Sequence, residues 1–123
     1  MPIVIRDNGS LLVTTVSGTI TAEELMIGAR EMGEIEARQS TSLPRLYDLS
    51  EVVALHIDFA TMHQFALLRN AAKIKEQTRA AIFAPSPLQY DFARMYQTHS
   101  GNPKLVIKVF REKEAAMKWL EAT

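Results

Sequence analysis

The side chains that most often carry out chemistry are few in this chain and scattered along it. Its three histidines are His56, His63 and His99, and no two of them have the i,i+4 or H-E-x-x-H spacing of a metal-binding helix. The chain has no cysteine, which excludes disulfides, thiolate catalysis and cysteine-ligated zinc. We therefore expect structural histidines, no metal site and no cofactor.

A serine–histidine–aspartate triad can be assembled on paper from Ser86, His99 and Asp48. The chain lacks both the G-x-S-x-G turn that exposes a nucleophilic serine and a glycine-rich oxyanion loop. Ser86 is instead explained as a helix cap, because Pro87 follows it and Gln89 stands three residues later. None of the five glycines lies in a phosphate-binding loop. The sequence predicts no catalytic residue and a protein that is not an enzyme.

Tyr90 and Arg94 are i,i+4 neighbours on the polar face of the helix that Ser86 begins. Since this helix follows a strand, Tyr90 is expected near the carboxyl edge of the sheet, where open α/β sheets bind ligands. Asp48 and Ser50 leave another strand at the same edge. This face is either the polar rim of a ligand site or an ordinary solvated helix surface.

A helix from Asp58 to about Gln77 carries two separate apolar arcs. The first arc is large enough to form a core and holds Phe59, Ala60, Leu67, Ala71 and Ile74. The second arc, of Phe65, Leu68 and Ala72, runs along one line of the helix. Because a surface helix normally has one apolar stripe, the second arc should contact a neighbouring helix, a ligand, a partner subunit or a membrane. The candidate ligand-binding residues are Phe59, Phe65, Leu68, Tyr90 and Arg94.

The composition is that of an ordinary globular protein, with 47% hydrophobic and 23% charged residues in 123. Fourteen basic residues balance fourteen acidic ones, so no field exists to hold a phosphate backbone and we expect no nucleic-acid partner. Arg6 and Asp7 interrupt the first apolar run, which is unlike a signal peptide. We expect a cytoplasmic protein whose residues 1–123 form a single domain.

Strands and helices are predicted to alternate along the chain. Strands are expected over 2–6, 11–17, 43–49, 79–84 and 104–110, with a hairpin turn at 7–10 and Gly18 ending the second strand. Helices are expected to begin at Thr21, Asp58 and Ser86, with a last one over 112–122. The third of these places Leu88, Phe92, Met95 and His99 on one apolar stripe. This pattern predicts an α/β fold, a β-β-α-β-α-β-α-β-α sandwich. Its five-stranded sheet is mostly parallel, with one antiparallel edge strand and about four helices.

Three stretches resemble one protein family. They are Tyr47-Asp48-Leu49-Ser50, the segment RAAIFAPSPLQYDFARMYQ and the segment VFREKEAAMKWL. With the order of elements, they make the chain similar to the SpoIIAA-like family, which has the STAS-domain fold of anti-sigma-factor antagonists. SpoIIAA-like proteins are also structurally similar to CRAL-TRIO lipid-transfer domains, and this resemblance implies an apolar pocket between helices and sheet.

The chain departs from the antagonist pattern at one position. Antagonists carry a phosphorylatable serine directly after an Ile-Asp pair, whereas here Phe59 follows Ile57-Asp58. We expect no phosphoryl switch there and a partly buried Phe59 ring. The favoured function is a non-enzymatic binding module for a small apolar or amphiphilic ligand, with a membrane surface as one place of action. The alternative is a protein-interaction module of the antagonist type without the serine, and a homodimer is a further option.

Overall fold

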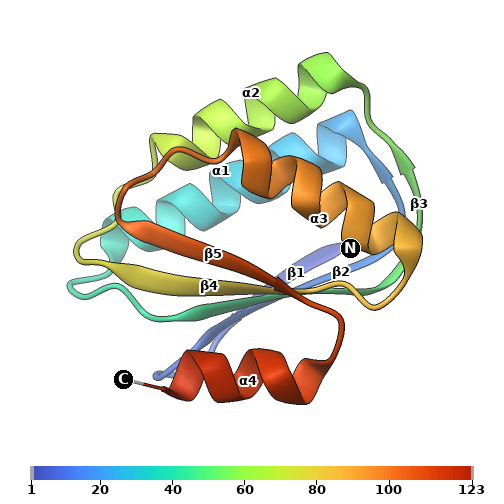
Figure 1. Ribbon diagram of the computed structural model, residues 1–123. Coiled ribbons are helices and arrows are strands. Elements are labelled where there is room, and N and C mark those ends of the chain that lie inside the picture. The colour runs from blue at the N-terminus through green and yellow to red at the C-terminus, as the bar shows by residue number, and fades with distance from the viewer. Residues whose placement is uncertain (1, 123) are drawn as a thin grey trace.

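The computed structural model describes residues 2–122, which form five strands and four helices in the expected order (Figure 1). The strands are β1 (Ile3–Asp7), β2 (Leu12–Thr21), β3 (Arg45–His56), β4 (Thr78–Phe83) and β5 (Leu105–Phe110). The helices are α1 (Ala22–Arg38), α2 (Phe59–Asn70), α3 (Pro87–His99) and α4 (Lys113–Glu121).

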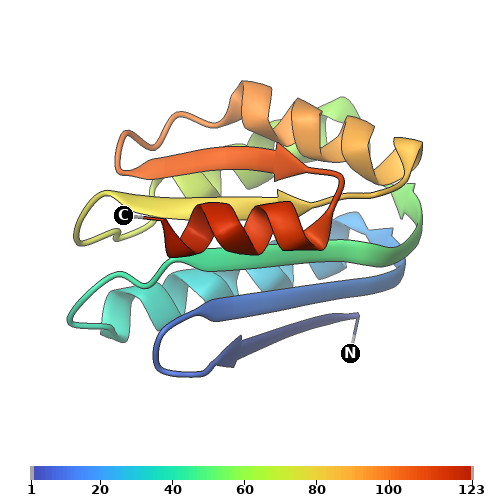
Figure 2. The ribbon, with the colours of Figure 1, turned by 60° about the horizontal axis from the view of Figure 1, so that its bottom comes forward.

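The strands lie in the order β1-β2-β3-β4-β5, and only β1 runs antiparallel to its neighbour. Each crossover advances by one strand in the same direction, so right-handed connections place α1, α2 and α3 on one face of the sheet. Helix α4 follows the last strand and covers the opposite face, mainly over β4 (Figures 1 and 2). The predicted α/β architecture, with its antiparallel edge strand, is confirmed.

The first two strands are joined by the predicted hairpin turn, but β2 does not end where we expected. Gly9 has a φ of 91°, and the Asn8 side chain accepts hydrogen bonds from the backbone N–H groups of Ser10 and Leu11. The expectation that Gly18 ends the second strand is wrong. Gly18 has a φ of 77° at an irregularity in the β2–β3 ladder, and β2 continues to Thr21.

The third strand is also longer than predicted. It reaches His56, past a stretch that contains Ser50 and Glu51 and reads as polar. Figure 1 shows the carboxyl ends of β2 and β3 rising together toward the helix layer. Buried Ile20 and Val52 on these raised ends extend the floor of the main core into a side wall.

Two apolar cores lie on the two faces of the sheet. The larger one fills the space between the sheet and α1, α2 and α3, and the smaller one lies under α4 around Leu46, Ala81 and Ala116. Residues of β3 and β4 alternate between the two cores, so both strands are covered on both faces. This explains the near-continuous apolar sequence of β4.

Helix α2 differs from its prediction in length and in orientation. It ends at Asn70 rather than near Gln77, where the loop after α3 meets it. Gly101 N–H donates to the Asn70 side chain at 2.8 Å, and Asn102 Nδ2 donates to the Arg69 carbonyl oxygen of the last turn at 3.5 Å.

The expected core arc of α2 is wrong for Phe59 and Leu67, which are 68% and 54% exposed, and for Ala60 and Ala71, which are also exposed. Its last member, Ile74, is buried but lies beyond the end of the helix. The expectation of a partly buried Phe59 ring is wrong too, because that ring is exposed. The buried face consists of Met62, Ala66 and Arg69.

Helix α3 is rotated by about one residue from the apolar stripe read in its sequence. Leu88 and Met95 of that stripe are exposed, whereas Gln89, Ala93 and Tyr96 are buried. The rotation is stable because buried Gln89 is not left without partners. Its Nε2 donates to the backbone oxygens of Ser50 and Val52, at 3.1 and 2.9 Å.

The capping box at Ser86 is confirmed and leads to a stability prediction. Gln89 N–H donates to Ser86 Oγ at 3.2 Å, and Ser86 N–H donates to Gln89 Oε1 at 3.0 Å. Loss of such a cap costs about 1 kcal/mol, so Ser86→Ala should lower the free energy of unfolding by that amount in urea titrations. Ser40→Ala, at an exposed loop position, should change it by less than about 0.5 kcal/mol. Equal stability of the two variants would contradict a structural role for Ser86.

Candidate functional site

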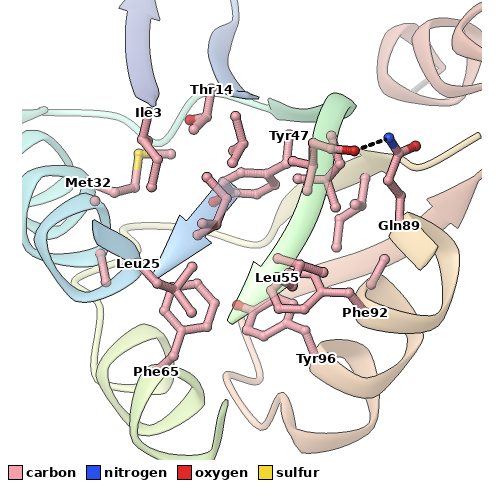
Figure 3. Close-up of a pocket in the computed structure, with 18 of the residues that line it drawn as sticks. Ile3, Thr14, Leu25, Met32, Tyr47, Leu55, Phe65, Gln89, Phe92 and Tyr96 are labelled. Atoms are coloured by element: carbon pink, nitrogen blue, oxygen red, sulfur yellow. Dashed lines mark hydrogen bonds between the residues drawn. The ribbon is translucent and has the colours of Figure 1, made fainter. Parts of the chain in front are cut away.

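A cavity of about 80 Å³ lies inside the larger core, between the helix layer and the sheet (Figure 3). Strands β1 to β4 form its floor and side wall, and helices α1, α2 and α3 form its roof. Most of its lining is aliphatic or aromatic. Leu55, Phe65 and Phe92 come from three different elements and are only half-buried, so they form the side on which the cavity approaches the surface.

A few polar side chains also line this cavity: Thr14, Tyr47, Arg69, Gln89 and Tyr96. Gln89 is held by the backbone of β3, as described above, and serves the fold. Thr14 is 5% exposed, and its Oγ1 has no hydrogen-bond partner among residues 2–122. An unpaired buried hydroxyl costs about 1–3 kcal/mol, and such groups are rare in native proteins. Among residues 2–122, Gln39 Oε1 is the one other buried side-chain oxygen or nitrogen without a partner.

Three buried charged side chains form a network that reaches the cavity through one of its members, Arg69. The Glu36 carboxylate of α1 binds Arg69 of α2 through two hydrogen bonds, at 2.7 and 2.8 Å, and also accepts a hydrogen bond from Arg45 of β3. All three side chains are at most 3% exposed. Arg45 also donates to the Leu43 carbonyl oxygen, at 3.2 and 2.9 Å. The network ties two helices to the central strand.

Two tyrosines border this charged network. Arg69 Nη2 donates to the Tyr47 hydroxyl at 3.2 Å. Burial lowers the pKa of Arg69, but Tyr47 and the Glu36 carboxylate outweigh that effect and raise it, so the guanidinium stays charged. Burial and Tyr47 raise the pKa of Tyr96 despite the nearby Arg69, so Tyr96 stays a neutral phenol. The site therefore holds a charged guanidinium and a neutral phenol next to an apolar space.

Of the five candidate ligand-binding residues, only Phe65 lines the cavity. Its ring packs against Tyr96, with the ring centroids 5.1 Å apart. Leu68 is 40% exposed. The exposed Phe59 ring packs edge-on against the His99 ring, with the ring centroids 5.2 Å apart. A role for Phe59 and Leu68 in binding stays a prediction.

Tyr90 and Arg94 lie together, as their spacing predicts, but outside the cavity lining. Arg94 Nη1 donates to the Tyr90 hydroxyl at 3.4 Å, and the Arg111 guanidinium lies over the Tyr90 ring at 5.3 Å. This is a surface cluster with two cations on one ring. Its part in ligand binding stays a prediction too.

The structure does not bring Ser86, His99 and Asp48 together as a catalytic triad. Ser86 and His99 lie at opposite ends of the 13-residue helix α3, and about 1.5 Å of rise per residue keeps them far apart. Asp48 is occupied by Ser50, whose hydroxyl and N–H donate to it at 2.6 and 2.9 Å. His99 Nδ1 is 2.8 Å from the Met95 carbonyl oxygen. Over residues 2–122, no cluster of three or more His, Asp or Glu side chains is placed to hold a metal ion.

Sequence reasoning missed the buried network of Glu36, Arg45 and Arg69. A signal was present for two of its members. Glu36 stands four residues after buried Met32 on the inner face of α1, and Arg69 stands three after Ala66 on the inner face of α2. Neither is among the candidate residues of the sequence analysis, because charged residues are expected on the outer face of a helix.

No family model matches the chain, and no curated protein matches it either. Among solved structures, it is similar to an uncharacterised protein of the DUF3478 family from Shewanella loihica PV-4, described as having a SpoIIAA-like fold. The TM-score is 0.61, and the match covers 96% of this chain and 91% of the other. This chain has the SpoIIAA-like fold. At a sequence identity of 23%, this similarity shows a shared fold but does not show a shared function.

The SpoIIAA-like fold was expected from the three sequence stretches. Two of these stretches contribute residues to the lining of the cavity. Tyr47 and Leu49 of the first stretch lie on the cavity floor, and the second supplies β4 and α3. The third stretch forms β5 and α4 and serves the smaller core. In the part of the chain that the structure covers, no helix has the length and apolar character needed to span a bilayer.

Proposed function

We propose that this protein is a non-enzymatic binding module that holds a small apolar or amphiphilic molecule in the cavity between helices and sheet. Small-molecule sites are concave, mostly apolar and carry a few placed polar groups. The cavity has that composition, with aliphatic and aromatic walls and polar side chains grouped around Tyr47 and Arg69.

The observation that carries the proposal is the pairing of this apolar space with the unpartnered Thr14 hydroxyl. A core residue with no binding role would be expected to be apolar here, because Thr14 lies on the inner face of β2 between buried Leu12 and Val16. A ligand with one polar group would supply the missing partner.

The size of the cavity limits what enters it. A cavity of about 150 Å³ holds benzene, so about 80 Å³ accepts a small group or one end of a longer molecule. The half-buried side chains of Leu55, Phe65 and Phe92 lie where such a molecule would enter.

Titration with octan-1-ol, followed by NMR of labelled methyl groups, tests the proposal. We expect saturable shifts at the methyl groups of Val16 and Ile82, which line the cavity, and none at Leu46 or Leu120, which belong to the smaller core. Triethylene glycol, a polar molecule of similar length, should produce no such shifts. Native mass spectrometry of protein purified without detergent adds a search for a bound molecule. If no apolar or amphiphilic probe gives saturable shifts at these methyl groups, the proposal fails.

The alternative, a protein-interaction module of the antagonist type without its serine, is favoured by one observation. Helix α2 begins at the position where antagonists carry the phosphorylatable serine, and it exposes three large apolar side chains, Phe59, Leu67 and Leu68. A Leu67→Glu variant distinguishes the two functions. It should weaken a protein interaction through the exposed face of α2 but leave ligand binding unchanged, because Leu67 does not line the cavity. Sedimentation of the original protein and of this variant reports whether that face mediates a homodimer.

A further inference from the structure

The buried network has one positive charge too many. It combines the guanidinium groups of Arg45 and Arg69 with the single carboxylate of Glu36, and all three are at most 3% exposed. No other ion pair of residues 2–122 brings a second carboxylate to either arginine. A buried charge without a counter-charge is expensive, so an anion beside this network would be strongly favoured.

Only one of the two arginines is available to a molecule in the cavity. Arg69 lines it, whereas Arg45 does not and donates to the Leu43 carbonyl oxygen instead. The hydrogen bonds from Arg69 to Glu36 and Tyr47 use three of its five N–H donors. Arg69 is therefore the cation that an anionic ligand would meet.

Hydroxyl donors stand beside Arg69 on the floor of the cavity. Tyr47 accepts a hydrogen bond from Arg69 with its oxygen, which leaves its own O–H proton to be donated to a ligand. Thr14 is the register partner of Tyr47 on the neighbouring strand, lines the same cavity, and has a hydroxyl without a hydrogen-bond partner among residues 2–122. A carboxylate has two oxygens that together accept about four hydrogen bonds, so it suits this set of donors.

We infer that the ligand is an apolar monocarboxylate whose carboxylate binds Arg69 and Tyr47. The first carbon atoms of its chain lie among the apolar walls of the cavity, and a longer chain continues toward the surface. This inference rests on the proposed binding function and names its ligand class. One negative charge balances the network, whereas a phosphate dianion would exceed it. A free short-chain acid and the end of a longer fatty acid share this chemistry.

Three eight-carbon compounds that differ only in their head group test the inference by calorimetric titration at pH 7. Octanoate should bind at least tenfold more tightly than octan-1-ol, and octylamine should not bind, because its ammonium group would meet Arg69. In the Tyr47→Phe variant, which keeps the ring and removes the hydroxyl, octanoate affinity should fall about tenfold. The affinity for octan-1-ol should change by less than twofold. Butanoate and dodecanoate, titrated in parallel, distinguish a short free acid from a lipid chain.

The outcomes separate the inference from the proposed function. If octan-1-ol binds as tightly as octanoate, or if Tyr47→Phe leaves the preference for octanoate unchanged, the inference fails and the binding function stands. If none of the compounds gives saturable binding, both fail. The Tyr47→Phe protein must unfold cooperatively in urea, and Thr14→Val serves as a second variant in which octanoate affinity should also fall.

Discussion

Glu36→Gln should lower the free energy of unfolding by about 3–5 kcal/mol, the largest effect expected from any conservative substitution in this chain. The substitution keeps the shape of the side chain but removes its charge. Arg45 and Arg69 would then be two buried guanidinium groups without a counter-ion. The effect should appear as a lower midpoint in urea titrations, with the cooperative transition retained if the variant folds.

Glu34→Gln is the matched control for this prediction. It makes the same chemical change on the same helix, but Glu34 is exposed, so stability should change by less than about 0.5 kcal/mol. A triple variant, Glu36→Leu with Arg45→Met and Arg69→Met, removes all three charges and should recover most of the lost stability. A loss of stability below about 1 kcal/mol for Glu36→Gln would contradict the claim that Glu36 is the buried counter-ion of Arg45 and Arg69.

The order of elements could be predicted because local signals and tertiary packing agree in most of the chain. Thr21 and Ser86 begin their helices through capping boxes, and Asn8-Gly9 forms the first turn, as the sequence indicates. The length of β3 could not be predicted. Its last part crosses a polar stretch and is held by pairing with the irregular end of β2, which is a long-range effect.

The faces of α2 and α3 were misread for one physical reason. Both helices bury a polar side chain, Arg69 or Gln89, whose partners come from elements distant in sequence. A periodicity of apolar residues places such a side chain outside, because it contains no information about those partners. The polar members of the site were missed for the same reason, since apolar periodicity does not mark them as buried. Only Phe65, an apolar residue of the second arc, was placed both as a candidate and at the cavity.

Ala93→Leu should abolish ligand binding while leaving the protein folded. Ala93 is fully buried on α3 and lines the cavity, so the added carbon atoms enter the space a ligand would occupy. We expect at least a thirtyfold loss of affinity for octanoate and for octan-1-ol alike, because both need that space. This differs from Tyr47→Phe, which should affect the acid alone.

The stability of the same variant provides an independent test of the cavity, with Ala116→Leu as its control. Ala116 is also fully buried, on α4, but it belongs to the smaller core and does not line the cavity. Overpacking a filled core costs about 1–3 kcal/mol, so Ala116→Leu should be destabilised by that amount. Ala93→Leu should lose less than about 1 kcal/mol, since filling a void recovers burial worth about 0.8 kcal/mol per methylene. If the two variants are equally destabilised, the space beneath α3 is too small to receive even a few carbon atoms. The binding function would then lose its structural basis.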